Sequence, residues 1–183
     1  RLDSLKSKRI AIDGYNMLYQ FLTTIRSRDG ALLTNARGDV TSHLTGLFSR
    51  IVSFLEGGIH PIFVFDGKPP ALKRQERERR KELKQEAEAA YREAVVEEDT
   101  EAMRKYASRT ARITPEILSS THELIAAFGL PQVQALSEGE AQVAFLVKHK
   151  YADYAVSQDF DTLLYCAPLL IRNLSLSQKR KKP

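Results

Sequence analysis

Cysteine is almost absent from this sequence, since Cys166 is the only one among 183 residues. A single cysteine can form neither an internal disulfide framework nor a thiolate metal cluster. Carboxylates are the plentiful metal-ligating groups that remain, because Asp and Glu together number 23. Oxygen ligands select hard cations, so we expect any bound metal to be of the Mg²⁺ or Mn²⁺ kind.

Long apolar runs are missing as well. No stretch of the sequence is long enough to cross a bilayer, and the segment before Asp13 lacks the hydrophobic region of a signal peptide. We therefore expect an intracellular protein that has no membrane partner.

The composition suits a folded domain that meets a polyanion. Hydrophobic residues make up 43% of the chain and charged residues 28%, which is enough apolar material for one substantial core and excludes a disordered chain. The formal net charge of +5 favours a nucleic-acid partner, although net charge alone is a weak indicator.

Short apolar runs alternate with segments of helical periodicity along most of the chain. The expected strands are residues 9–13, 61–66, 131–135, 152–159 and 169–174. Gly57, Gly58 and Gly129 stand where the helices before two of these strands should end. The alternation predicts an α/β fold with a largely parallel central sheet and helices on both faces. We expect one domain over residues 1–183, interrupted by a helical insertion at about 71–115.

Acidic residues follow the expected strands at one edge of this sheet. In open parallel sheets, ligands bind beyond the carboxyl ends of the strands. The six carboxylates expected there are Asp13, Asp66, Glu138, Glu140, Asp159 and Asp161. Without cations they would repel one another and raise one another's pKa values, so the cluster predicts a site for divalent metal ions.

Each acid also has a purely structural interpretation. Asp13 could cap the helix that follows it, and Asp66 could hold an Asp-Gly turn; the acids after the fourth strand could also be helix caps. Ser137 and Glu140 match a capping box, which leaves Glu138 unexplained. Acids at all four strand ends favour the metal-site interpretation.

The insertion carries a basic stripe. Residues 71–98 contain no glycine or proline and form a helix by propensity. On a helical wheel one stripe collects Lys73, Arg77, Arg80 and Lys84. Such a charge run is commonly a solvated helix laced with i,i+4 ion pairs. Because this helix leaves directly from Asp66, its stripe could instead guide a phosphate backbone toward the metal site.

The strings YNMLYQFLTTIR, TSHLTGLF, VFDGKPP, SEGEAQVAFL and SQDFDTLL occur in this order after Asp13. Together they resemble the flap endonuclease family of structure-specific 5′ nucleases, especially its archaeal members, over about residues 10–173. The resemblance implies a PIN-like nuclease core with a helical arch. It also implies a 5′ flap endonuclease with 5′–3′ exonuclease activity, which acts on flapped or branched DNA in replication and repair.

The resemblance assigns roles to individual residues. Asp13, Asp66, Glu138 and Glu140 would hold one Mg²⁺, and Asp159 and Asp161 a second, with Mn²⁺ able to substitute. Two such metals activate a water for in-line attack and stabilise the leaving 3′-oxygen. The catalytic cations of the arch would be Lys73 and Arg80. The DNA-binding residues would be Tyr19, which stacks on a base, Arg26 and Thr41 near the 3′ flap, and Lys68, Arg77 and Lys84.

The sequence also departs from the family pattern. Family members carry a further metal-associated Asp, a helix–turn–helix element that grips downstream duplex, and a C-terminal peptide for the sliding clamp, and the sequence ends at SQKRKKP without them. We therefore expect a nuclease core that is incomplete at its C-terminus, from an archaeal cytoplasm or nucleoid or a eukaryotic nucleus.

Three other functions stay open. The string DFDTLL is also typical of haloacid-dehalogenase-type phosphatases, whose first Asp is a nucleophile, but only 22 residues follow Asp161. The string DGYN suits a PIN or NYN ribonuclease. A catalytically impaired module that binds only metal and DNA is the third, and Mg²⁺-dependent flap cleavage distinguishes it from the nuclease.

Overall fold

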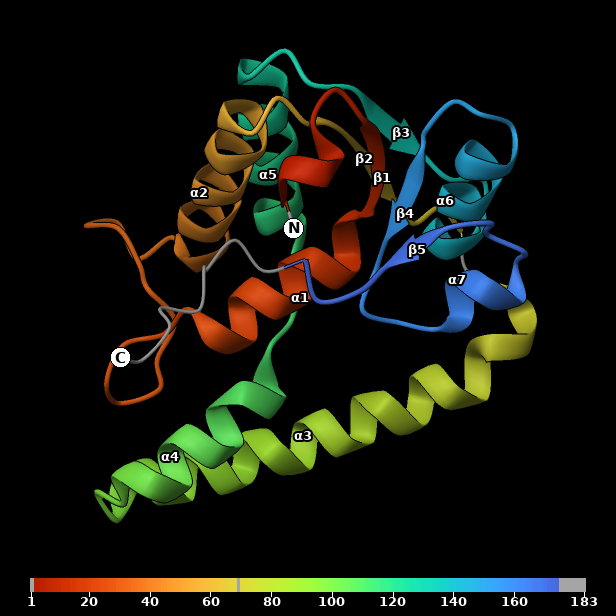
Figure 1. The fold of residues 1–183 in the computed structure, drawn as a ribbon. Coiled ribbons are helices and arrows are strands. Elements are labelled where there is room, and N and C mark those ends of the chain that lie inside the picture. The colour runs from red at the N-terminus through yellow and green to blue at the C-terminus, as the bar shows by residue number, and fades with distance from the viewer. Residues whose placement is uncertain (1, 69, 175–183) are drawn as a thin grey trace, which may run out of the picture.

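The sheet is fully parallel, as the alternation predicts. A computed structural model describes residues 2–68 and 70–174. Its strands lie in the order β3-β2-β1-β4-β5 (Figure 1), and every neighbouring pair is parallel. Their bounds are β1 Arg9–Asp13, β2 His60–Phe65, β3 Gln132–Gln134, β4 Tyr154–Val156 and β5 Leu170–Ile171.

Helices cover both faces of the sheet. One face packs against α1 (Gly14–Thr24), α2 (Ser42–Glu56) and α5 (Pro115–Ala127), and the other packs against α6 (Gly139–Lys148). Figure 1 shows these layers on either side of the strands. A short 3-10 helix, η1 (Leu2–Leu5), precedes β1, and α7 (Asp161–Leu164) lies between β4 and β5.

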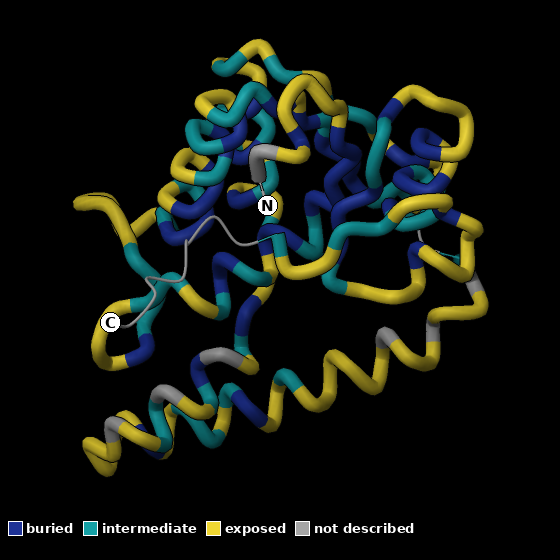
Figure 2. The backbone as a smooth tube through the Cα atoms, viewed as in Figure 1, coloured by how far each residue is buried: buried dark blue, intermediate teal, exposed yellow. Residues whose placement is uncertain are grey.

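The position of β1 in the middle of the sheet explains why its sequence is an unbroken apolar run. Successive side chains of a strand point to opposite faces. Ile10 and Ile12 therefore enter the core on the α1–α2–α5 side, while Ala11 enters the core on the α6 side. All three are almost completely buried, and Figure 2 shows buried backbone gathered around the strands.

The predicted insertion is a helical arch. It consists of η2 (Ala71–Lys73), α3 (Arg74–Val96), α4 (Thr100–Ala107) and η3 (Ser108–Thr110). The long helix α3 crosses beyond the carboxyl edge of the sheet, and α4 folds back along it (Figure 1). Most of α3 is exposed to solvent (Figure 2), and Ala87 and Ala94 are its buried hydrophobic residues among those described. The core contributes little to holding this arch in place.

Two sequence-based boundaries are corrected. The fourth strand was predicted to run to residue 159 and ends at Val156. Beyond that point, the backbone N–H groups of Gln158 and Asp159 donate to the side chains of Asn16 and Ser157 instead of to a neighbouring strand. The fifth strand is likewise shorter than residues 169–174 and spans only Leu170–Ile171.

Gly46 allows α1 and α2 to approach closely. A Cβ added there would lie 2.5 Å from ring atoms of Phe21. We predict that Gly46→Ala destabilises the protein by about 1–3 kcal/mol through overpacking, because the gain in helix propensity of about 1 kcal/mol offsets only part of that strain. Urea denaturation measures the change. Ser49→Ala, on an exposed position of the same helix, should change stability by less than about 0.5 kcal/mol, and equal effects of the two substitutions would contradict the prediction.

Candidate active site at the carboxyl edge of the sheet

The fold brings four of the predicted carboxylates to one region. Asp13 is the last residue of β1, and Asp66 directly follows β2. Glu138 is the N-cap residue of α6, and Glu140 lies in the first turn of that helix. Because β1 and β2 are parallel neighbours, their carboxyl ends meet beside the start of α6.

Asp13 is the buried member of this group, with 4% of its surface exposed. Its Oδ1 accepts a hydrogen bond of 2.9 Å from the backbone N–H of Asn16, so it does cap α1. Ser157 Oγ donates to Oδ2 over 3.3 Å. Burial, together with the negative charges of Glu140 and Asp66, raises the pKa of Asp13 to about 7. Asp13 therefore both caps α1 and belongs to the carboxylate cluster.

Asp66 links β2 to the start of α6. Its Oδ1 accepts a 2.7 Å hydrogen bond from the N–H of Gly139, so the side chain does more than hold a local turn. A Cβ at position 139 would lie 2.7 Å from this oxygen, which explains the glycine there. Burial raises the pKa of Asp66, and the charge of Glu138 adds to the effect.

Glu138 and Glu140 have opposite electrostatic surroundings. Burial raises the pKa of Glu140, and the charge of Asp66 raises it further. Burial acts in the same direction on Glu138, but an ion pair with Lys73 and a hydrogen bond from the Tyr165 hydroxyl outweigh it, so the pKa of Glu138 is lowered. The alternative interpretation of Ser137 and Glu140 as a capping box does not apply, since Glu138 takes the N-cap position and makes no side-chain capping bond.

Asp159 lies on the segment between β4 and α7, Asp161 is the first residue of α7, and both are exposed. Neither is the N-cap residue of α7, which is Phe160. Contacts with α1 and with the chain after β5 hold this segment in place. The N–H of Gln158 donates to Asn16 Oδ1 over 3.2 Å, and the guanidinium of Arg172 stacks 3.7 Å from the centre of the Phe160 ring.

The donor set suits a hard divalent cation. Every candidate ligand is a carboxylate, and a nearly buried Asp13 with further acids close by requires positive charge for compensation. Among the side chains that the structure describes, no three acidic, His or Cys side chains are gathered closely enough to hold a metal ion. The carboxylates instead accept hydrogen bonds from protein donors, such as Gly139 N–H at Asp66. The six-carboxylate ligand set stays a prediction.

A hollow of about 760 Å³ opens between the arch and α1. Its lining combines aromatic, aliphatic and basic side chains, among them Tyr19 of α1, Leu83 and Lys84 of α3, and Tyr106 of α4. The Lys84 ammonium lies 5.0 Å from the centre of the Tyr19 ring and 3.5 Å from its hydroxyl. An aromatic face beside basic groups is a combination that binds single-stranded nucleic acid.

Arg80, a predicted catalytic cation of the arch, also lines the hollow, and its Nε pairs with Glu76 at 2.9 Å. The remaining predicted DNA contacts lie elsewhere. Lys68 is exposed, and the side chain of Arg77 lies outside the described residues. Arg26 donates to the carbonyl oxygens of Leu22 and Gly30, both over 2.8 Å, and so has a structural role at the end of α1.

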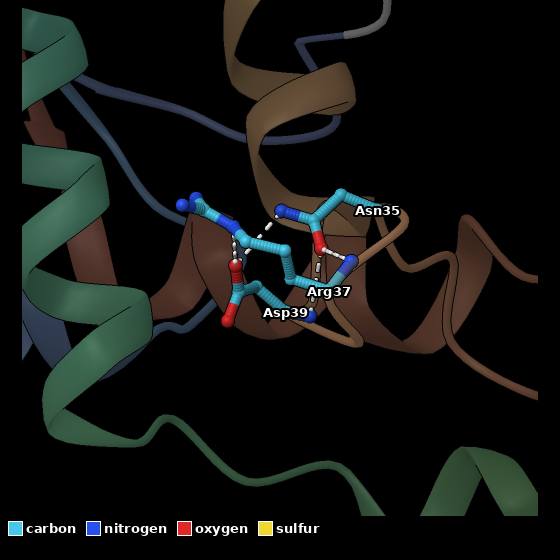
Figure 3. Close-up of polar contacts among 3 residues, drawn as sticks. All are labelled: Asn35, Arg37 and Asp39. Atoms are coloured by element: carbon cyan, nitrogen blue, oxygen red, sulfur yellow. Dashed lines mark hydrogen bonds and ion pairs between the residues drawn. The ribbon is translucent and has the colours of Figure 1, made fainter.

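Thr41 and Arg26 bound the loop that joins α1 to α2, with Thr41 as the N-cap residue of α2. Figure 3 shows the tip of this loop, where Asn35 Oδ1 accepts the N–H groups of Arg37 and Asp39 over 2.9 and 3.0 Å. Arg37 Nε lies 3.2 Å from Asp39 Oδ2, so the charge at the tip is internally compensated.

Sequence reasoning missed Tyr165, Ser157 and Asn16. Tyr165 contacts Glu138, Ser157 contacts Asp13, and Asn16 joins α1 to the segment after β4. Ser157 lies close to Asp159 in the sequence and Asn16 lies close to Asp13, and this proximity is the only sequence signal for either residue. Nothing in the sequence pairs Tyr165 with Glu138.

Two family models match the parts of the chain on either side of the arch's second half. Residues 1–87 match the XPG N-terminal domain, and residues 129–183 match the XPG I-region. The chain is 51% identical over 182 residues to Flap endonuclease 1 of Thermofilum pendens, covering 100% of this chain and 53% of the relative. It therefore spans about half the length of the curated relatives it matches.

Two solved structures have the same fold. Flap endonuclease-1 from Methanococcus jannaschii matches with a TM-score of 0.71 and 46% identity, over 97% of this chain and 56% of that one. The catalytic core of Rad2 in complex with DNA substrate matches with a TM-score of 0.69 and 31% identity, over 97% of this chain and 47% of that one.

A parallel sheet whose carboxyl edge carries acids beneath a helical arch defines a PIN-like nuclease core. The chain belongs to the XPG and flap endonuclease family.

The raised pKa of Asp13 makes stability depend on pH in a defined direction. The folded state favours the protonated carboxyl, so its contribution is complete below a pH of about 4 and is lost as pH rises through about 7. We predict that Asp13→Asn has similar stability to the unmodified chain near pH 4 and is more stable by a few kcal/mol near pH 8. Urea denaturation with a chelator present tests this.

Glu56→Gln, at an exposed position of α2, serves as the control for Asp13→Asn. Its stability difference should be small at both pH values. A difference for Asp13→Asn that stays constant between the two pH values would contradict the assignment.

Proposed function

We propose that this protein is a structure-specific 5′ flap endonuclease with 5′–3′ exonuclease activity, which hydrolyses DNA phosphodiesters with two divalent metal ions. The observation that carries the proposal is the position of the arch. Its basic and aromatic hollow opens beside α1, whose first residue directly follows Asp13 of the carboxylate cluster. The sequence identity of 51% to Flap endonuclease 1 of Thermofilum pendens, over 182 residues of this chain, supports the same conclusion.

The carboxylates have two proposed tasks. Asp13, Asp66, Glu138 and Glu140 would hold one Mg²⁺, and Asp159 and Asp161 the other, with Mn²⁺ able to substitute. The bound metals would supply an activated water and stabilise the leaving 3′-oxygen. The rigid attachment of Asp13 and Asp66 to backbone N–H groups fixes two of these carboxylates relative to the sheet, which favours precise placement of the reacting groups.

The arch supplies the proposed contacts to DNA. Lys73 would offset charge on the scissile phosphate, and Arg80 would do so once substrate displaces Glu76. Tyr19 would stack on a base, with Lys84 beside its ring. Lys68 and Arg77 would contact the phosphate backbone, and the loop bounded by Arg26 and Thr41 would receive the 3′ flap.

The proposed partners and setting follow from the family resemblance. They are flapped or branched DNA during replication and repair, and a sliding clamp for the full-length protein. No helix in the described part of the chain has the length and apolar character needed to cross a bilayer.

A second candidate is a module that binds metal and DNA without efficient cleavage. The observation in its favour is that the chain spans about half the length of its curated relatives. Placing the scissile phosphate correctly is worth on the order of 7–11 kcal/mol in the best intramolecular cases, and in the family the grip on downstream duplex lies in the other half.

We predict that the 183-residue chain cleaves a 5′-flap substrate far more slowly than a chain extended to the length of its relatives. The measurement is a single-turnover assay of both chains with Mg²⁺ on one substrate. The double variant Asp159→Asn and Asp161→Asn, made in the extended chain, should abolish cleavage and serves as the control for contaminating nuclease. Equal rates of the two chains would show that the sheet edge and the arch suffice for positioning.

Two basic residues of the arch should affect different quantities, Lys84 the affinity for DNA and Arg80 the rate of cleavage. We predict that Lys84→Ala weakens DNA binding and reduces the slope of log K against log salt by about one, because a lysine neutralises at most one phosphate. Arg80→Ala should mainly slow the single-turnover cleavage rate of the extended chain. Lys81→Ala removes an equal charge from an exposed position of α3 as the control. If Arg80→Ala weakens binding but leaves the rate at saturating enzyme unchanged, its catalytic role is refuted.

A further inference from the structure

Lys73 joins the arch to the carboxylate cluster. It is the last residue of η2, directly before the long arch helix α3, and its ammonium pairs with Oε1 of Glu138. The side chain of Glu138 is only 12% exposed and that of Lys73 is 50% exposed. The pair is thus partly shielded from solvent, where charge interactions are stronger than at a free surface.

The charge of Lys73 reaches more than one carboxylate. It lowers the pKa values of Asp66, Glu138 and Glu140 relative to what burial alone would impose. In return, Glu138 and Glu140 raise the pKa of Lys73, with the hydrogen bond to Glu138 as the largest cause. One ammonium therefore stands in the field of three acids that crowd the same edge of the sheet.

Tyr165 keeps Glu138 in this position. Its hydroxyl donates to Oε2, while Lys73 engages Oε1. Glu138 therefore connects three parts of the fold, namely the base of the arch, the start of α6 and the end of α7. Few of the arch side chains that the structure describes are buried, so this connection is a substantial part of what positions its base.

We propose that Lys73 is the resident counter-ion of the carboxylate cluster in the metal-free protein, and that a divalent cation competes with it for Glu138. Metal binding and docking of the arch base then oppose each other. This inference rests on the proposed metal site and adds a regulatory coupling to it. The physical reason is that the cluster needs positive charge, and an ammonium and a divalent ion repel each other at the same carboxylate.

The coupling must be reciprocal. If the docked lysine weakens metal binding, bound metal weakens the docking of the lysine by the same factor. Metal would then release Lys73 from Glu138 and loosen the base of the arch. The freed ammonium becomes available to a phosphate group at the moment when the metal site is formed.

Calorimetric titration with Mn²⁺ in the absence of DNA tests the competition. It is done at about pH 8, above the pKa of Asp13 of about 7. Lys73→Met should tighten Mn²⁺ binding by about tenfold, within the usual range of coupling of about 5–150-fold. The matched control is Lys81→Met, the same substitution at an exposed position farther along α3, and it should change affinity by less than about twofold, because salt screens distant exposed charges.

Limited proteolysis gives a second readout that does not depend on calorimetry. Chymotrypsin should cut the unmodified arch at Leu83 or Tyr91 faster with Mn²⁺ than without it. In Lys73→Met the arch base is already released, so proteolytic cleavage should be fast and independent of the metal.

Urea denaturation midpoints of all variants show whether each one folds. If Lys73→Met does not fold, Lys73→Gln is used in its place.

The outcomes separate this inference from the proposed function. Tighter binding in Lys73→Met together with metal-dependent cleavage of the unmodified arch supports the inference. Mn²⁺ binding of equal strength in the unmodified chain and in Lys73→Met overturns it while leaving the proposed metal site intact. If neither chain binds Mn²⁺, the metal site and the inference both fall.

Discussion

Crowding of negative charge at the carboxyl edge of a parallel sheet is the constraint on which the rest of this structure depends. Parallel β1 and β2 necessarily end side by side, and Asp13 and Asp66 stand at those ends. Burial of Asp13 makes its ionised form costly. The Asn16 N–H and the Ser157 hydroxyl donate to Asp13. The neighbouring acids have partners of their own, since the Gly139 N–H donates to Asp66 and the Lys73 ammonium pairs with Glu138.

The arch follows from the same constraint. It is inserted shortly after Asp66, the acid that follows β2, so its basic residue Lys73 falls within reach of the cluster. The helix α3 then crosses beyond the carboxyl edge of the sheet with most of its surface exposed (Figures 1 and 2). Its position depends on a few polar contacts, such as Lys84 with Tyr19, and on the packing of η3 against α1. A segment held in this way opens at a lower free energy than the core does, which suits a structure that must admit a polymer.

Periodicity and glycine placement predicted most of the fold. The runs at β1 and β2 alternate between two cores, and Gly58 and Gly129 have the positive φ angles, 66° and 67°, that helix ends require. The error at the end of the fourth strand has a tertiary cause. At residues 157–159 the sequence supports a longer strand. A distant partner, the side chain of Asn16, accepts the backbone N–H of Gln158 instead.

The sequence by itself determined the class of the fold, the residues at the strand ends, the basic stripe of the insertion and the family resemblance, because each is a property of local spacing. Only the tertiary structure decided which acids face which cations. Lys73, Glu138 and Tyr165 belong to three different elements, and no local pattern relates them. Whether Glu138 meets a lysine, a phenol or other carboxylates depends on how η2, α6 and α7 converge at the sheet edge, and that convergence follows from the packing of the whole core.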